Sequence, residues 1–139
     1  MITVNIDDFY HDVAVTLLSL YQQFPLKISL YIEDVCGPDE ADEFGLHSRR
    51  HLSCIGALEW MHDEGFIRYT DIAKQECAEQ CTLTQKAFRK LAFPKIDQCR
   101  EQASSIEKQQ SSLVYKLHQA VKDQSSIEIR DLIENYFLN

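Results

Sequence analysis

The segment Ala57–Arg68, with the sequence ALEWMHDEGFIR, contains the change of backbone structure that decides the fold. In the residues before Gly65, apolar side chains recur at intervals of three and four, which predicts a helix from Ser48 to Glu64. Gly65 follows that helix at the position where a positive φ is favoured, so we expect the helix to end there. From Phe66 to Ile72 the side chains alternate in character, which predicts a strand.

A second segment, Leu83–Leu91 with the sequence LTQKAFRKL, predicts the next helix along the chain. Thr84 can cap that helix with its side-chain oxygen, and Pro94 terminates it. A short strand is expected around Cys81–Leu83, separated from the strand before it by the polar stretch Ala73–Gln80. The two strands are therefore expected to form a β-hairpin.

The residues before these segments predict a long helix and two short elements. Apolar residues at helical spacing predict a helix from Asp8 to Phe24, with aspartates to cap its start and Pro25 to end it. Leu26–Ile28 is a short extended candidate, and Leu30–Cys36 is a candidate short helix. The acidic run Asp39–Glu43 is expected to be a loop or turn.

This order of elements resembles a winged helix-turn-helix domain of the bacterial regulator type. ALEWMHDEGFIR is similar to the end of a recognition helix and the entry into the wing, and LTQKAFRKL resembles the "Leu-Thr-x-Lys-Gly" exit from the wing, with Ala87 in place of glycine. The resemblance covers about residues 8–93. It departs from the usual pattern at Gly37–Gly45, which is longer than a standard helix-turn-helix turn. It implies a mostly α fold with a small β-hairpin wing, a winged-helix domain in residues 1–94 and C-terminal helices in residues 95–139.

The C-terminal segment shows a weak heptad pattern between Ile96 and Ala120, followed by a capping box in which Ser125 pairs with Glu128. A C-terminal helix often forms the dimer in such regulators, so the resemblance implies a homodimer. The candidate dimerisation residues are Ile106, Leu113, Leu117, Ile129, Leu132 and Tyr136. The alternative is that this segment folds back on its own domain.

The charge of the chain is unevenly distributed. The net charge is -8, and residues 1–45 carry one basic and nine acidic side chains, while residues 46–94 carry seven basic and six acidic ones. A nucleic-acid binder normally presents a clustered basic face, because phosphate neutralisation supplies most of its non-specific affinity. The composition therefore argues against tight non-specific DNA binding, and it leaves room for a local basic face in the middle third.

The same composition bears on the cellular setting. The chain of 139 residues has no apolar run long enough to span a bilayer and no secretory signal as written, so no membrane partner is expected. Five cysteines are an odd number, which favours a reducing environment over a disulfide framework. A cytoplasmic location is therefore expected.

The resemblance places the candidate DNA contacts at the start of the third helix and on the wing, because that helix enters the major groove. The candidates are His47, Ser48, Arg49, Arg50, His51 and Ser53 on the helix, with Arg68 and Lys74 on the wing. An equally weighted alternative is that Arg49 and Arg50 pair with the acidic loop Asp39–Glu43, an ordinary surface ion pair of small energetic consequence.

Metal-ligating residue types also occur here. His47, His51 and Cys54 fall on one helical face, and Cys77 and Cys81 lie in or beside the wing. Strong zinc motifs use paired Cys-x2-Cys or His-Glu-x2-His, which are both missing from the sequence, and Cys54 is equally well explained as a core residue. No metal or other cofactor is therefore predicted.

No motif of a catalytic or nucleotide-binding site occurs in the sequence, so an enzyme is not expected. Two hypotheses of function follow. The first, slightly preferred, is a dimeric DNA-binding transcription regulator that contacts DNA through Arg49, Arg50 and the wing. The fold resemblance favours this hypothesis, whereas the net charge of -8 favours the second. The second is an acidic winged-helix module, or accessory subunit of a larger complex, that binds another protein through its acidic N-terminal third.

Overall fold

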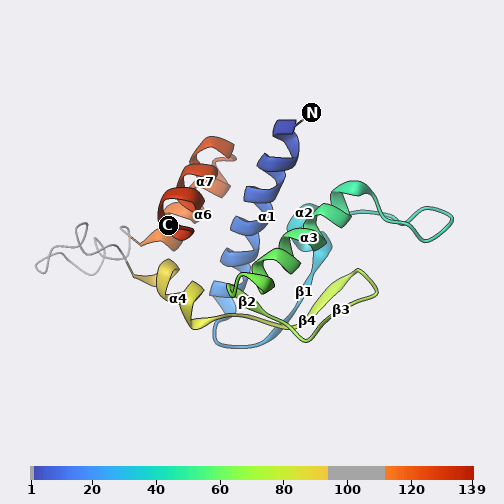
Figure 1. Cartoon of the computed structure of the whole chain (residues 1–139), viewed down its shortest axis with the longest axis horizontal. Helices are drawn as coiled ribbons and strands as arrows, with labels where there is room; N and C mark the ends of the chain where they lie inside the picture. Colours follow the sequence, from blue (N-terminus) through green and yellow to red (C-terminus); the bar gives the residue numbers. More distant parts are fainter. Residues whose placement is uncertain (1, 94–111) are drawn as a thin grey trace, which may run out of the picture.

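The computed structural model describes residues 2–93 and 112–139, with side chains from residue 5 onward, and it is mostly helical with a small antiparallel sheet, as the sequence predicts (Figure 1). The helices are α1 (Ile2–Gln23), α2 (Ile32–Cys36), α3 (Arg49–Asp63), α4 (Gln85–Ala92), α6 (Leu113–Lys122), α7 (Ser126–Leu132) and the π-helical turn η2 (Ile133–Phe137). The strands are β1 (Ile28–Tyr31), β2 (Ile67–Arg68), β3 (Asp71–Ala73) and β4 (Cys77–Leu83). None of the described helices has the length and apolar character needed to cross a membrane.

Strand β4 is the centre of the sheet, and all of its pairings are antiparallel. Its first half lies between β1 and β3, so that Ala78 faces Leu30 on one side and Ile72 on the other. Its second half pairs with β2, with Ile67 opposite Leu83. Strand β2 follows α3 along the chain, and β3 and β4 then form a hairpin because a short turn joins them.

Four boundaries differ from those the sequence predicts. Strand β4 begins at Cys77 rather than around Cys81, because its first half pairs with β1 and β3. Helix α1 begins at Ile2 rather than Asp8, so the aspartates lie inside the helix and do not cap it. Leu30 was expected to be helical, but its backbone pairs with β4. It therefore belongs to strand β1, which begins at Ile28. The expected strand 66–72 is divided into β2 and β3.

The predicted helix ends of α3 and α4 are confirmed by their capping contacts. Ser48 accepts a hydrogen bond from the His51 backbone N–H at the start of α3. Gly65 has a φ of +79° directly after α3, the left-handed conformation that glycine adopts without steric cost. Thr84 accepts from the Ala87 N–H and donates to the Gly65 carbonyl at 2.7 Å, which ties the start of α4 to the end of α3.

The C-terminal helices pack against α1 of the same chain (Figure 1). Leu117, Ile133 and Phe137 are fully buried in the core that α1 and α3 also form, and the ring of Phe137 lies 4.7 Å from that of Phe66. The described part of the expected segment 95–139 therefore shares one core with the expected domain 1–94.

The residues named as dimerisation candidates pack within their own chain. Leu113, Leu117 and Ile129 are buried, and Leu132 and Tyr136 are partly buried against the same core, so these apolar groups are used within one chain. The alternative, a segment that folds back on its own domain, describes the observed packing. The sixth candidate, Ile106, lies outside the described residues.

Candidate functional site

The start of α3 is the part of the molecule where the predicted functional residues gather. It follows a loop of residues 37–48 that extends away from the helices and sheet, drawn in teal in Figure 1. Asp42 holds the outer part of this loop by accepting hydrogen bonds from the backbone N–H groups of Phe44 and Leu46, both at 2.9 Å. The side chains of Phe44 and Leu46 are 79% and 64% exposed.

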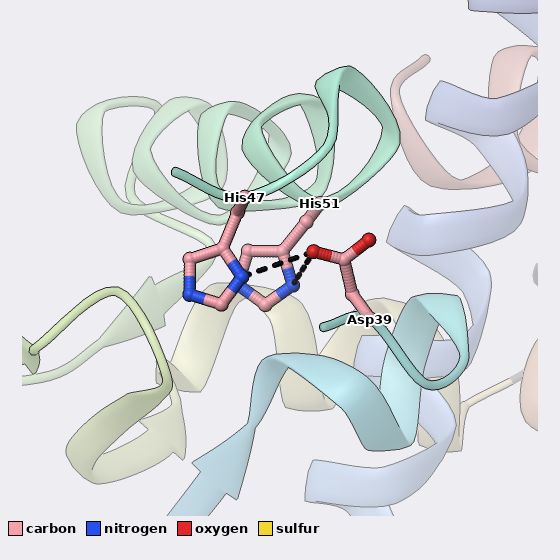
Figure 2. A group of neighbouring side chains, drawn as sticks. All are labelled: Asp39, His47 and His51. Carbon is pink, nitrogen blue, oxygen red and sulfur yellow. Dashed lines mark hydrogen bonds and ion pairs between the residues drawn. The ribbon is translucent and has the colours of Figure 1, made fainter. Parts of the chain in front are cut away.

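Asp39, His47 and His51 meet at the base of the loop, where one oxygen of Asp39 faces both imidazole rings (Figure 2). Asp39 Oδ2 lies 3.0 Å from His47 Nδ1 and 3.9 Å from His51 Nδ1. The two rings are stacked, with centroids 3.9 Å apart and planes inclined by 11°. Hydrogen bonding from Ser48, through its hydroxyl and its backbone N–H, lowers the pKa of Asp39 to about 2, so the group is a carboxylate at neutral pH.

His51 is buried, with only 1% of its surface exposed. Its Nε2 lies 2.6 Å from the backbone carbonyl oxygen of Gln75, in the turn between β3 and β4. Its Nδ1 is buried and has no hydrogen-bond partner among the described residues. His51 therefore links α3 to the β3–β4 hairpin through one nitrogen and directs the other toward Asp39.

Arg50 contacts α1 instead of the acidic loop. Its guanidinium donates two hydrogen bonds to Asp12, at 2.6 and 2.7 Å, and its Nε lies 3.5 Å from Asp8. Asp12 is 1% exposed, and its hydrogen bonds raise the pKa of Arg50, so the guanidinium stays charged. This contact corrects the interpretation that Arg50 pairs with Asp39–Glu43, and it engages the guanidinium that was expected to contact DNA.

The remaining candidate DNA contacts are divided between the interior and the surface. His51 is buried and Ser48 is the N-cap of α3, so these two are already used within the chain. Arg49 and Ser53 are exposed, and they line an open hollow of about 540 Å³ together with Leu52 and three further residues: Asn5, Asp8 and Arg50.

The two candidate contacts on the hairpin are exposed as well. Arg68 lies on β2, and Lys74 lies in the β3–β4 turn with a φ of 54°. Neither residue forms an ion pair with another residue of the described ranges. Arg68 lies beyond the opposite end of α3, whereas the His51–Gln75 contact joins the turn that carries Lys74 to the start of that helix.

The cysteines do not join the histidines, which corrects the weak metal candidates Cys54, Cys77 and Cys81. All three are buried free thiols and none belongs to the Asp39–His47–His51 group. Burial raises the pKa of Cys54 above its ordinary range, and it raises the pKa of Cys81 to about 12. Cys54 and Cys81 are therefore core residues that stay protonated at neutral pH.

The sequence does not identify two acidic residues of this site. Asp39 lies twelve positions before His51 in a run of exposed acids, and only the folding of the loop brings it back to α3. Asp12 lies among the apolar residues of a helical stripe, which indicates that its carboxylate is buried. A buried charge needs a partner of opposite charge, and this is the signal from which a nearby cation could have been predicted.

Comparisons with known proteins add no residues to this site. No family model, curated protein or solved structure matches the chain. Its function is therefore inferred from the contacts, burial and charge of the described residues.

Proposed function

We propose that this chain is a non-enzymatic winged-helix protein that binds another protein through the start of α3 and the loop before it. The winged-helix assignment is supported by the order of the elements: a helix, a strand, two helices, a hairpin and a further helix. It is also supported by the pairing of β1 with β4 on the edge opposite the hairpin partners β2 and β3.

The observation that carries the choice of protein over DNA is the charge of the exposed surface. Between residues 39 and 80, the exposed basic side chains are Arg49, Arg68 and Lys74. The exposed acidic side chains of the same segment are Glu40, Asp42, Glu43, Glu59, Asp63, Glu64, Asp71 and Glu76. Eight exposed acidic side chains and three basic ones give this segment a net negative surface charge, which repels a phosphate backbone. Affinity for DNA depends on neutralising phosphates with Lys and Arg.

The same segment also exposes apolar side chains. Phe44, Leu46 and Leu52 are 79%, 64% and 45% exposed, and they lie within nine consecutive residues of the chain. Leu52 also lines the hollow beside Arg49. Apolar side chains surrounded by polar ones are typical of a protein-binding surface. The partner that fits this surface supplies apolar side chains and an excess of lysine and arginine.

The proposal is tested by capturing the partner with wild-type protein and with matched variants. The test variant is Phe44→Ser with Leu46→Ser, which removes the apolar groups of the loop without touching the core. The control is Leu26→Ser, which removes a leucine that is 65% exposed just beyond the opposite end of α1. Bound proteins from an extract of the source cells are quantified by mass spectrometry, and the purified partner is then titrated calorimetrically.

We expect one protein to be retained in stoichiometric amount by the wild type and by the control. We expect its affinity for the loop variant to be at least about tenfold lower, the effect of losing a contact of roughly 1.4 kcal/mol. A captured protein that binds wild type and loop variant equally would contradict the assigned surface. Failure to capture any protein, together with binding to DNA, would replace the proposal by the DNA hypothesis.

A further inference from the structure

The group at the base of the loop combines the ligand types that a transition metal prefers. One ligand atom from each of Asp39, His47 and His51 lies within 4.8 Å of the other two. Donor atoms about 2.1 Å from a tetrahedral ion lie about 3.4 Å from one another. The observed separations of 3.0 and 3.9 Å from Asp39 Oδ2 to the two imidazole nitrogens bracket that value. An ion can therefore be reached with small side-chain movements.

The tautomer of His51 provides the second and independent observation. Its Nε2 lies 2.6 Å from the Gln75 carbonyl oxygen, which can only accept, so Nε2 carries the hydrogen. In a neutral imidazole, Nδ1 then carries a lone pair. That lone pair is buried, has no hydrogen-bond partner among the described residues and faces the Asp39 carboxylate 3.9 Å away. A cation between them, either a metal ion or a proton, would stabilise two electron-rich atoms that face each other in a buried site.

The outer contacts of the group are also those of a metal site. Metal-binding histidines commonly donate their second ring N–H to a backbone carbonyl, which orients the ring and makes it a better ligand. His51 makes this contact with Gln75. Asp39 is held in place by the Ser48 N–H at 3.1 Å. Both outer contacts come from the backbone and are present without the ion.

We propose that Asp39, His47 and His51 bind a divalent transition-metal ion of the zinc class, with a fourth position open to water. Two imidazole nitrogens and one carboxylate oxygen form a donor set that suits zinc, iron(II) and cobalt(II). His47 takes its Nε2–H tautomer and tilts out of the present stack, so that its Nδ1 exchanges the hydrogen bond with Asp39 for a bond to the ion.

This inference goes beyond the proposed function and stands without it. Asp39 and His47 are at opposite ends of the loop that carries Phe44 and Leu46, and His51 belongs to α3. An ion bound by all three closes the base of that loop and joins it to α3. Through the His51–Gln75 contact it also fixes the β3–β4 turn.

The test is a titration of the full chain, freed of metal by a chelator and without an affinity tag, with zinc and separately with cobalt(II). The test variants are Asp39→Asn and His47→Gln, which keep the size of each side chain and remove ligand character. The matched control is His62→Gln, an exposed histidine of α3 that lies 3.5 Å from Asp63. Circular dichroism confirms that each variant is folded before it is titrated.

We expect one zinc ion per chain and unchanged zinc affinity in the control. Both test variants should bind zinc at least about tenfold more weakly, because losing a ligand lowers metal affinity at least as much as losing an outer-shell contact. The cobalt complex should show visible d–d absorption without thiolate charge transfer. Binding that survives in both test variants, or thiolate charge transfer, would place the metal on cysteines and overturn the proposal. Absence of metal binding would also overturn the proposal. Nitrogen-15 NMR would then show both His51 nitrogens protonated, which means that a proton is the cation between His51 and Asp39.

Discussion

Replacing Arg50 with methionine removes the cation that neutralises a buried carboxylate. The guanidinium makes two charge-assisted hydrogen bonds of 2.6 and 2.7 Å to Asp12, which is 1% exposed. Removing one partner of a buried ion pair costs about 3–5 kcal/mol, because the other charge is left without compensation. The side chain of Arg50 is 31% exposed, so water can reach part of the space it leaves. We therefore expect a loss near the lower limit, about 3 kcal/mol.

The assay is equilibrium unfolding in urea, followed by circular dichroism. With a slope of about 2 kcal/mol per molar urea, a loss of 3 kcal/mol lowers the midpoint by about 1.5 M. Arg49→Met is the matched control, because Arg49 is the exposed neighbour of Arg50, and its change should stay within about 0.5 kcal/mol.

A double-mutant cycle separates the ion pair from other effects of the substitution. Arg50→Met combined with Asp12→Leu removes both charges together, and replacing a buried pair by apolar groups is often nearly neutral. We expect the double variant to recover about 2 kcal/mol relative to the sum of the two single changes. A loss below about 1 kcal/mol in Arg50→Met, or strict additivity of the two changes, would refute this account of the α1–α3 contact.

Three further outcomes follow from the packing and the pKa values. Cys54 and Cys81 should resist thiol reagents at pH 8 until the chain unfolds, because burial raises the pKa of both thiols, that of Cys81 to about 12. The unfolded chain ionises these thiols above about pH 8.5 and the folded chain does not, so the free energy of unfolding should fall as the pH rises above that value. Thermal melts across this pH range measure the effect. Thr84→Ala should lower the free energy of unfolding by about 1–2 kcal/mol, since it removes both the cap of α4 and the bond to the Gly65 carbonyl; an unchanged urea midpoint would contradict this. Phe137→Ala should cost about 3–5 kcal/mol and destabilise the whole chain in one transition; separate unfolding of the C-terminal helices would show that they do not share the core.

The local structure of α3 and α4 could be predicted from the sequence because local chemistry decides it. Ser48 and Thr84 have side-chain oxygens that accept backbone hydrogen bonds at helix starts, and Gly65 adopts the positive φ that ends α3. These choices depend on neighbours within four residues. The boundaries at β1 and β3 depend on pairing with β4. The partners in β4 lie about fifty residues along the chain from β1 and a few residues from β3. Strand pairing can override a local helical pattern.

The candidate site was only partly predictable for the same reason. The sequence pattern groups His47 with His51, and their rings do stack, although His47 precedes the N-cap of α3 and is not placed by helical spacing. Their partner Asp39 is brought to them by the course of the loop, which no periodic pattern specifies. Spacing also placed Cys54 on the same face, but three residues further along the helix it faces the core and is fully buried.

The fate of the basic residues shows how a pattern can suggest the wrong role. Arg49 and Arg50 are adjacent and look equivalent in the sequence, yet one is exposed and the other binds the buried Asp12. A helix turns by about 100° per residue, so neighbours face different environments. A variant with both Arg49→Ala and Arg50→Ala would therefore lose stability through Arg50, so Arg49→Ala alone is the informative change for DNA binding.

The most direct test of the central claim, that the start of α3 serves protein contacts and not DNA, is fluorescence anisotropy of a labelled DNA duplex. The duplex is titrated with the wild-type chain at low salt, about 20 mM, where electrostatic binding is strongest. The account predicts no saturable binding, because exposed acidic side chains outnumber exposed basic ones in residues 39–80. Saturable binding that weakens with added salt and is lost in Arg49→Ala, while the fold is retained, would contradict it.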